Sequence, residues 1–106
     1  MINEKILSEV KRRLVSQYNP LAIYIFGSYA WGHPDEESDL DILIVIDQYT
    51  KDRFQEISDG YRALMDLGLF KDILIFSKNE FEKCSADATS ICNRVVLEGK
   101  KIYAKA

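Results

Sequence analysis

Two aspartates, Asp39 and Asp41, are the residues of this sequence whose type and spacing most clearly could do chemistry. They open an apolar run that closes with Leu43 to Ile46. In a β-strand, residues two apart point to one face and lie roughly 7 Å apart, so the two carboxylates can meet over one site. Acids that open a buried strand are costly unless water, protons or cations compensate for their charge. A divalent cation is the obvious compensator.

A third acid and a Gly-Ser pair are expected at the same place. Asp72 opens another short apolar run, and the helical pattern before it is long enough for a crossover that makes the two strands parallel. Parallel neighbours start at the same edge of a sheet, so we expect Asp72 beside Asp39 and Asp41. If the strand that ends at Gly27 runs antiparallel to its neighbour, Gly27 and Ser28 reach that edge too.

This set of residues suits the chemistry of phosphates. Three carboxylates favour Mg²⁺, a hard ion that keeps several waters and shares its shell with substrate phosphates. Gly27 permits close backbone approach, Ser28 offers a hydroxyl, and a following short helix could point N–H groups at phosphate oxygens. In nucleotidyl transfer a protein mainly positions groups and neutralises charge, and two ions about 3.5 to 4 Å apart clamp the attacking and leaving oxygens. The inferred arrangement fits that task.

Alternating helices and strands must position these residues. Helical spacing and short apolar runs mark each element, and Pro20, Gly68 and Gly99 follow the ends of three of them. The expected helices cover residues 3–18, 51–67, 77–83 and 86–98, and the expected strands cover residues 21–26, 39–46, 71–76 and 101–104, the last at an edge. Ser77 and Glu80 resemble a capping box. No repeat or linker interrupts the chain, so we expect one α/β domain over residues 1–106.

Composition excludes several classes of protein. With 106 residues, 47% hydrophobic and 29% charged, the chain fits one folded domain and not a disordered or fibrous protein. A net charge of -3 repels phosphate backbones, so we expect no direct nucleic-acid partner. No apolar run approaches the ~20 residues of a membrane helix, and the start does not resemble a signal peptide, so we expect a cytoplasmic protein.

The remaining reactive side chains give little indication of a function. Cys84 and Cys92 lack a paired Cys-x-x-Cys spacing, so we expect free, partly buried thiols in place of a disulfide or zinc site. His33, the sole histidine, is expected to be a plain loop residue, with a nucleotide or acceptor contact as the alternative.

Each chemical assignment also has a plainer alternative. Asp39 and Asp41 could form a solvated strand end, and Asp72 could be a surface acid beside a lysine. Gly27 and Ser28 could form only a turn that ends a strand. The spacing between the Gly-Ser pair and the two aspartates favours the chemical interpretation over these.

At these residues the sequence resembles a known family. Gly27-Ser28, ten intervening residues and Asp39-Leu40-Asp41 resemble the GSx10DxD signature of the minimal nucleotidyltransferases, small relatives of DNA polymerase beta. The resemblance covers nearly the whole chain and includes the leading helix, the third acid in residues 71–75 and the closing residues 97–103. It implies a polymerase beta-like nucleotidyltransferase fold, with a small mixed sheet flanked by helices.

The resemblance also implies roles for the five residues. Asp39 and Asp41 would bind two Mg²⁺ ions, and Asp72 would complete the metal site and accept the proton of the acceptor hydroxyl. Gly27 and Ser28 would hold the triphosphate of the substrate ATP. All three aspartates are therefore both the catalytic and the metal-binding candidates.

The chain resembles the small stand-alone members of this family, which are typically encoded together with a helical HEPN ribonuclease toxin and act as its antitoxin. The resemblance implies that the chain neutralises its toxin by transferring AMP from ATP to a toxin tyrosine hydroxyl, within a hetero-oligomer. A non-catalytic antitoxin that acts by binding, and a nucleotide transferase for a small molecule such as an aminoglycoside, are the alternatives. The chain departs from many relatives at Trp31, where they carry an arginine.

Overall fold

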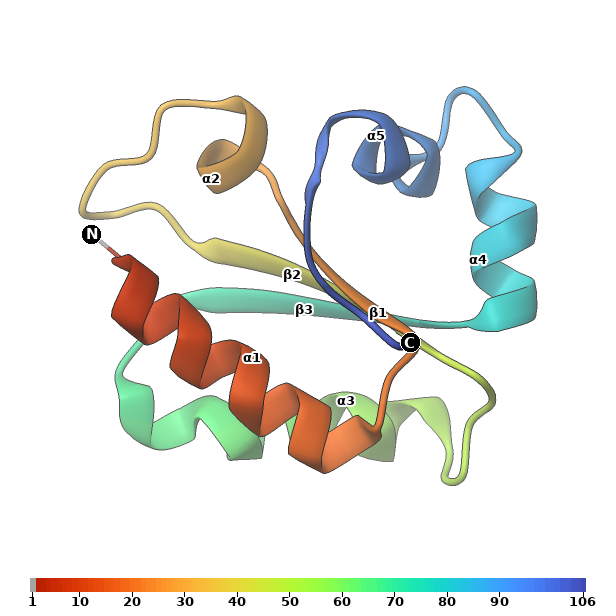
Figure 1. Cartoon of the computed structure of the whole chain (residues 1–106), viewed down its shortest axis with the longest axis horizontal. Coiled ribbons are helices and arrows are strands. Elements are labelled where there is room, and N and C mark those ends of the chain that lie inside the picture. The colour runs from red at the N-terminus through yellow and green to blue at the C-terminus, as the bar shows by residue number, and fades with distance from the viewer. Residues whose placement is uncertain (1) are drawn as a thin grey trace.

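The computed structural model describes residues 2–106 and contains a four-stranded sheet with helices on both faces (Figure 1). The helices are α1 (Glu4–Tyr18), α2 (Ser28–Trp31), α3 (Arg53–Leu64), α4 (Lys78–Ser85) and α5 (Ile91–Glu98), and a 3-10 turn, η1 (Met65–Leu67), follows α3. The strands are β1 (Ala22–Phe26), β2 (Leu40–Ile46), β3 (Lys71–Ser77) and β4 (Lys100–Ala104). No helix in residues 2–106 has the length and apolar character to cross a membrane.

The sheet is mixed, and its topology brings the predicted residues to one edge. The strand order is β3-β2-β1-β4, with β2 and β3 parallel and β1 antiparallel to both β2 and β4. The predicted mixed sheet and the parallel pairing of β2 with β3 are confirmed. Because β1 runs against β2 and β3, its carboxyl end lies at the edge where those two strands begin, next to α2 (Figure 1).

Alternating side chains of the sheet build two hydrophobic clusters. The larger cluster joins β-strand residues such as Ile25 and Ile42 with buried residues of α1 and α3, including Leu14 and Leu64. We call this side of the sheet the α1/α3 face. The smaller cluster lies on the opposite side and joins residues such as Leu43 with Val95 of α5 and the half-buried Phe81 of α4, and we call this side the α4/α5 face.

Several helix ends follow from capping side chains that the sequence already contains. Asn3 and Asp52 accept hydrogen bonds from the backbone N–H groups of Ile6 and Gln55, at 2.9 Å each, and so begin α1 and α3. The predicted capping box of Ser77 and Glu80 is present at the start of α4. These local contacts explain why the helices begin close to the predicted positions.

The last helix begins later than predicted. The sequence pattern places it at residue 86, whereas α5 begins at Ile91. The Asp87 carboxylate accepts a hydrogen bond from Thr89 N at 2.9 Å, and the Ser90 hydroxyl caps Asn93 N at 3.0 Å. Polar side chains that bind nearby backbone groups stabilise a turn instead of a helix, so residues 86–90 connect two short helices.

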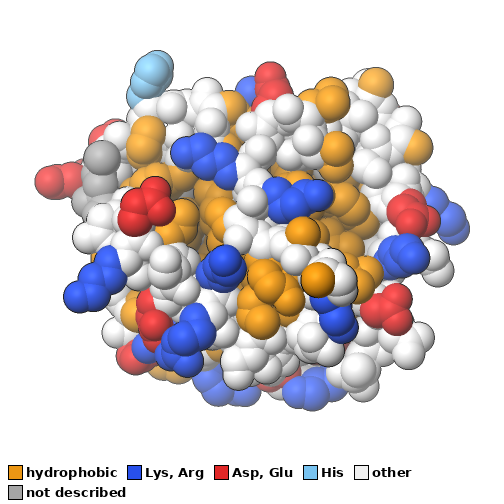
Figure 2. Space-filling model, in the orientation of Figure 1, with side chains coloured by type: hydrophobic (Ala, Val, Ile, Leu, Met, Phe, Trp, Pro, Cys, Tyr) orange, Lys and Arg blue, Asp and Glu red, His pale blue; other side chains and the backbone are white. Residues whose placement is uncertain are grey.

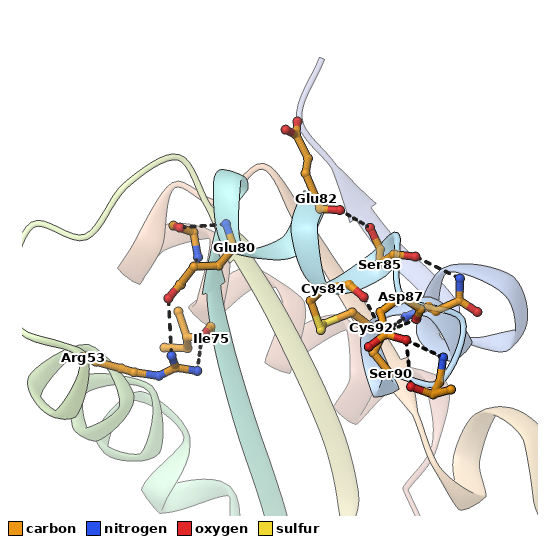
Figure 3. Close-up of a disulfide and its surroundings, with 12 residues drawn as sticks. Arg53, Ile75, Glu80, Glu82, Cys84, Ser85, Asp87, Ser90 and Cys92 are labelled. Atoms are coloured by element: carbon orange, nitrogen blue, oxygen red, sulfur yellow. Dashed lines mark hydrogen bonds and ion pairs between the residues drawn. A yellow bond between two sulfur atoms is a disulfide. The ribbon is translucent and has the colours of Figure 1, made fainter.

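This turn also changes the prediction for the cysteines. The structure pairs Cys84 and Cys92 in a disulfide between the end of α4 and the start of α5, with Cα atoms 5.6 Å apart (Figure 3). The predicted free thiols are therefore wrong. The turn reverses the chain and brings the two helix ends together, and Asn93 Nδ2 donates to Ser85 O at 2.9 Å beside the disulfide. Sequence spacing alone does not reveal this reversal.

The face of the molecule seen in Figure 2 combines apolar and cationic side chains. Hydrophobic side chains gather near its centre, and Lys and Arg side chains stand among and around them. Among the apolar side chains that remain largely exposed are Val96 and Leu97 of α5. This face of the molecule is therefore not uniformly acidic, although the chain carries a net charge of -3.

Candidate active site

Asp41 and Asp72 lie side by side at the edge of the sheet. The parallel register pairs Asp41 of β2 with Asp72 of β3, just as it pairs Leu43 with Leu74 two residues further on. Leu43 and Leu74 pack on the α4/α5 face. Because side chains two apart in a strand share a face, both carboxylates also point to the α4/α5 side. Asp41 is half-buried and Asp72 is exposed.

Asp39 lies just outside the strand that was predicted to contain it. β2 begins at Leu40, whose backbone N–H donates to the Phe70 carbonyl at 2.8 Å and so makes the first cross-strand bond. Asp39 precedes this bond and is exposed. Its side chain is thus less constrained by the sheet than those of Asp41 and Asp72, which the strand register holds in place.

The electrostatics of this edge show negative charge without a cationic partner. Burial raises the pKa of the Asp41 carboxyl above its ordinary value, and the nearby charges of Asp72 and Asp39 raise it further. None of the ion pairs found within residues 2–106 includes any of these three carboxylates. The edge is therefore a cluster of like charges that a bound cation would relieve.

The backbone of Gly27 lies directly against the Asp41 carboxylate of this cluster. Its φ of 72° is a conformation that side-chain-bearing residues rarely adopt, and a Cβ at this position would lie 2.0 Å from Asp41 Oδ2. The register explains the contact, because Phe26, the residue before Gly27, pairs with Asp41. Only glycine allows the chain to turn here against the carboxylate. Ser28 follows as the first residue of α2 and is half-buried.

The type of donor at this edge fits a hard divalent cation, since aspartate oxygens are the ligands that such ions prefer. Within the described residues 2–106, however, no three His, Cys, Asp or Glu side chains already converge as ligands of one ion. The register supplies two adjacent carboxylates, and a complete shell needs the exposed Asp39, water or substrate oxygens as well. The magnesium site stays a prediction.

Sequence reasoning missed a cation stacked on an aromatic ring on the α4/α5 face, where α5 meets α2. The guanidinium carbon of Arg94 lies 4.0 Å from the ring centroid of Trp31, and the Trp31 ring packs against Phe26 with centroids 6.2 Å apart. Arg94 belongs to α5 and Trp31 to α2, so no local pattern connects them. His33 is exposed in the loop after α2, as a plain loop residue would be.

Comparisons with known proteins agree with this geometry. The model of the family "Polymerase beta, Nucleotidyltransferase" matches residues 8–106. A protein of Methanocaldococcus jannaschii named "Putative protein adenylyltransferase MJ1379" is 40% identical over 72 residues, which cover 67% of this chain and 72% of that protein. The similarity to this relative therefore extends over most of both chains.

Two solved structures share the fold. A structure described as a toxin-antitoxin with AMP-PNP aligns with a TM-score of 0.69 at 22% identity, over 92% of this chain and 73% of the other. A structure from Sulfolobus solfataricus described as "a putative nucleotidyltransferase" aligns with a TM-score of 0.60 at 22% identity, over 95% of this chain and 79% of the other. The fold that the motif implies is confirmed.

Proposed function

Because the chain belongs to the polymerase beta nucleotidyltransferase family, we propose that it transfers AMP from ATP to a hydroxyl group of a partner protein. The observation that carries this proposal is the pairing of Asp41 with Asp72 directly beside Gly27 and Ser28. A protein acceptor is supported by the name of the M. jannaschii relative, and ATP as the donor is supported by the AMP-PNP in the description of the toxin-antitoxin structure.

The reaction requires this chain's residues to accept a proton, to let the triphosphate approach closely and to donate a hydrogen bond to a phosphate oxygen. The acceptor hydroxyl oxygen forms a bond to the α-phosphorus of ATP, the bond from that phosphorus to the bridging oxygen breaks, and pyrophosphate leaves. Asp72, which is exposed at the start of β3, accepts the proton that the hydroxyl loses. Gly27 lets the triphosphate approach the backbone, and the Ser28 hydroxyl donates a hydrogen bond to a phosphate oxygen.

Asp39, Asp41 and Asp72 are the residues that would hold Mg²⁺. When bound, the metal would supply positive charge that neutralises the phosphates and polarises the reacting oxygens. The raised pKa of Asp41 is compatible with this assignment, because burial and then the neighbouring charges of Asp72 and Asp39 disfavour its ionised form, and a bound cation would offset both effects.

We further propose that the acceptor is a tyrosine hydroxyl of a HEPN ribonuclease toxin, and that the transfer neutralises the toxin. The GSx10DxD resemblance supports this partner, and a solved toxin-antitoxin structure has the same fold. The exposed Val96 and Leu97 supply apolar surface on α5 with which a partner could pack.

The test is transfer of radiolabelled AMP from ATP to the co-purified partner. The double variant Asp39→Asn, Asp41→Asn is expected to abolish labelling while the complex still forms, because both substitutions keep side-chain size and remove charge. Asp47→Asn, at an exposed position just after β2, is the matched control and should label the partner normally. Unchanged labelling by the double variant would refute the assigned site.

The same variants separate transfer from neutralisation by contact. The exposed apolar residues of α5 are the observation that favours a binding antitoxin. If the double variant forms the complex and still protects cells from the toxin, contact alone explains neutralisation. If protection disappears although the complex persists, transfer is required. Labelling of an aminoglycoside in the absence of any protein acceptor would instead favour a small-molecule substrate.

A further inference from the structure

A cation on α5 faces the same side of the sheet as the paired carboxylates. The guanidinium of Arg94 stacks over the Trp31 ring at 4.0 Å, and its Nε donates to Glu98 at 2.6 Å. We propose that Arg94, held by Trp31, binds one of the outer phosphates of the nucleotide, and this inference rests on the proposed function. It assigns a phosphate-binding role to a residue outside the Gly-Ser and Asp-x-Asp motifs.

Two contacts connect Arg94 to the carboxylate edge. Trp31 is the last residue of α2, the short helix that begins at Ser28. Its ring packs on Phe26, and the Phe26 Cα is paired with that of Asp41. Phe26 and Trp31 both belong to the cluster on the α4/α5 face, which is the face of Asp41. The stack therefore borders the site on the side to which its carboxylates point.

The backbone that carries Arg94 is fixed at both ends of α5. The neighbouring Val95 and the nearby Cys92 are fully buried, and Cys92 is joined to α4 by the disulfide. At the other end, a Cβ on Gly99 would lie 3.1 Å from the Ile25 carbonyl oxygen, so the end of α5 sits against β1. A side chain on a fixed helix can present its charge at a defined place without a large entropic cost.

The guanidinium itself remains available to a ligand. The Arg94 side chain is 53% exposed, and among residues 2–106 its only hydrogen-bond and ion-pair partner is Glu98, through Nε. Its two terminal nitrogens make no hydrogen bond to these residues. Stacking on an indole ring leaves the planar fork of donors directed outward, and that fork matches the geometry of phosphate oxygens.

Other cations near the sheet are less well placed for this role. Lys101 Nζ lies 5.5 Å from the ring centroid of Tyr24. Tyr24 is two residues before Phe26 in β1 and is therefore further from the edge at which the carboxylates lie. Lys71 Nζ donates to the Leu69 carbonyl at 3.2 Å and lies 5.8 Å from the Tyr61 ring, next to α3 and so away from the α4/α5 face. Arg94 is thus the cation that is in contact with the helix following Gly27.

The test compares nucleotide binding by single variants of the whole chain. We expect Arg94→Ala to weaken ATP binding roughly 10- to 100-fold, the effect of losing a charged hydrogen bond. Binding of AMP should weaken less, since AMP lacks the outer phosphates. Arg94→Lys should be intermediate, because lysine keeps the charge but not the fork. Arg12→Ala is the matched control: Arg12 is also exposed and bound to a glutamate, but it lies on α1.

Calorimetric titration gives the affinities, and labelled transfer gives kcat and KM for ATP. The inference predicts a larger change in KM than in kcat, with the melting temperature of Arg94→Ala close to that of wild type. Equal ATP affinity of Arg94→Ala and Arg12→Ala would overturn it, as would equal losses of ATP and AMP binding together with a lower melting temperature. A wild-type chain that binds no ATP would instead refute the proposed function.

Discussion

The carboxylate pair gives a stability prediction that does not depend on catalysis. Asp41 and Asp72 occupy paired positions on neighbouring strands, which lie about 4.8 Å apart. Two unit charges about 5 Å apart repel by about 3 kcal/mol at an effective dielectric constant of 20, and by about 0.8 kcal/mol in water. Because Asp72 is exposed and Asp41 is only half-buried, solvent screening favours the lower value. We expect Asp41→Asn to raise the free energy of unfolding by about 1 kcal/mol.

The pH dependence of this gain has a definite sign. The pKa of Asp41 is raised in the folded protein, so folding binds a proton there more tightly than the unfolded chain does. The stabilisation that comes from this tighter proton binding is fully present below the pKa of Asp41 in the unfolded chain. It is lost as the pH rises through the higher pKa of Asp41 in the folded protein. At neutral pH the ionised Asp41 therefore destabilises the fold, and Asp41→Asn removes this penalty. The gain should shrink as the pH falls toward the ordinary aspartate range.

The assay is thermal and urea unfolding of the metal-free protein, in the presence of a chelator. For a domain of this size, about 1 kcal/mol corresponds to a rise of about 4 to 8 °C in the melting temperature. Asp47→Asn, beyond the far end of β2, is the control and should change little. A melting temperature of Asp41→Asn equal to or below that of wild type, or a gain that persists undiminished at pH 3, would refute this reasoning.

Three further substitutions or treatments test other parts of the structure. Gly27→Ala should cost at least about 1 kcal/mol in urea unfolding and impair transfer, because its Cβ would collide with the Asp41 carboxylate at a positive φ. Reducing the Cys84–Cys92 disulfide should lower the free energy of unfolding by about 2.5 kcal/mol. Dithiothreitol should not change the stability of the control variant Cys84→Ser. Equal urea-unfolding midpoints of the wild type with and without reductant would contradict the disulfide. Hydrogen bonds from two arginines of α1 lower the pKa of Glu9 to about 2. The wild type should therefore be more stable than Glu9→Gln at pH 7, and it should lose that advantage as the pH falls from about 4.5 toward 2. A difference in stability that does not vary with pH would contradict this expectation.

Strand pairing at the site was predictable because it follows from local patterns. The helix between the apolar runs that begin beside Asp41 and Asp72 is long enough for a crossover, and a crossover gives a parallel pair with a common edge. The glycine at the end of β1 was recognisable as a position of close approach. Its contact with the Asp41 carboxylate depends on the antiparallel register of β1 with β2, which the sequence suggested only conditionally.

Contacts between distant elements were not predictable from one sequence. The disulfide depends on a turn after α4 that reverses the chain, and the helical pattern over residues 86–98 concealed that turn. The stack of Arg94 on Trp31 depends on how α5 and α2 pack over the same strands, and Arg94 lies in no recognisable motif. Asp39 fell outside β2 because the first cross-strand bond belongs to Leu40, a difference of one residue that period-2 alternation cannot resolve.

The most direct test of the central claim is the intact mass of the partner protein after incubation with this chain, ATP and Mg²⁺. With the wild-type chain, the partner should gain the mass of one or more AMP units. With Asp41→Asn, which should still fold and bind the partner, its mass should not change. A partner that gains AMP equally with both chains, or that gains none with the wild type, would contradict the claim that the paired carboxylates carry out nucleotidyl transfer.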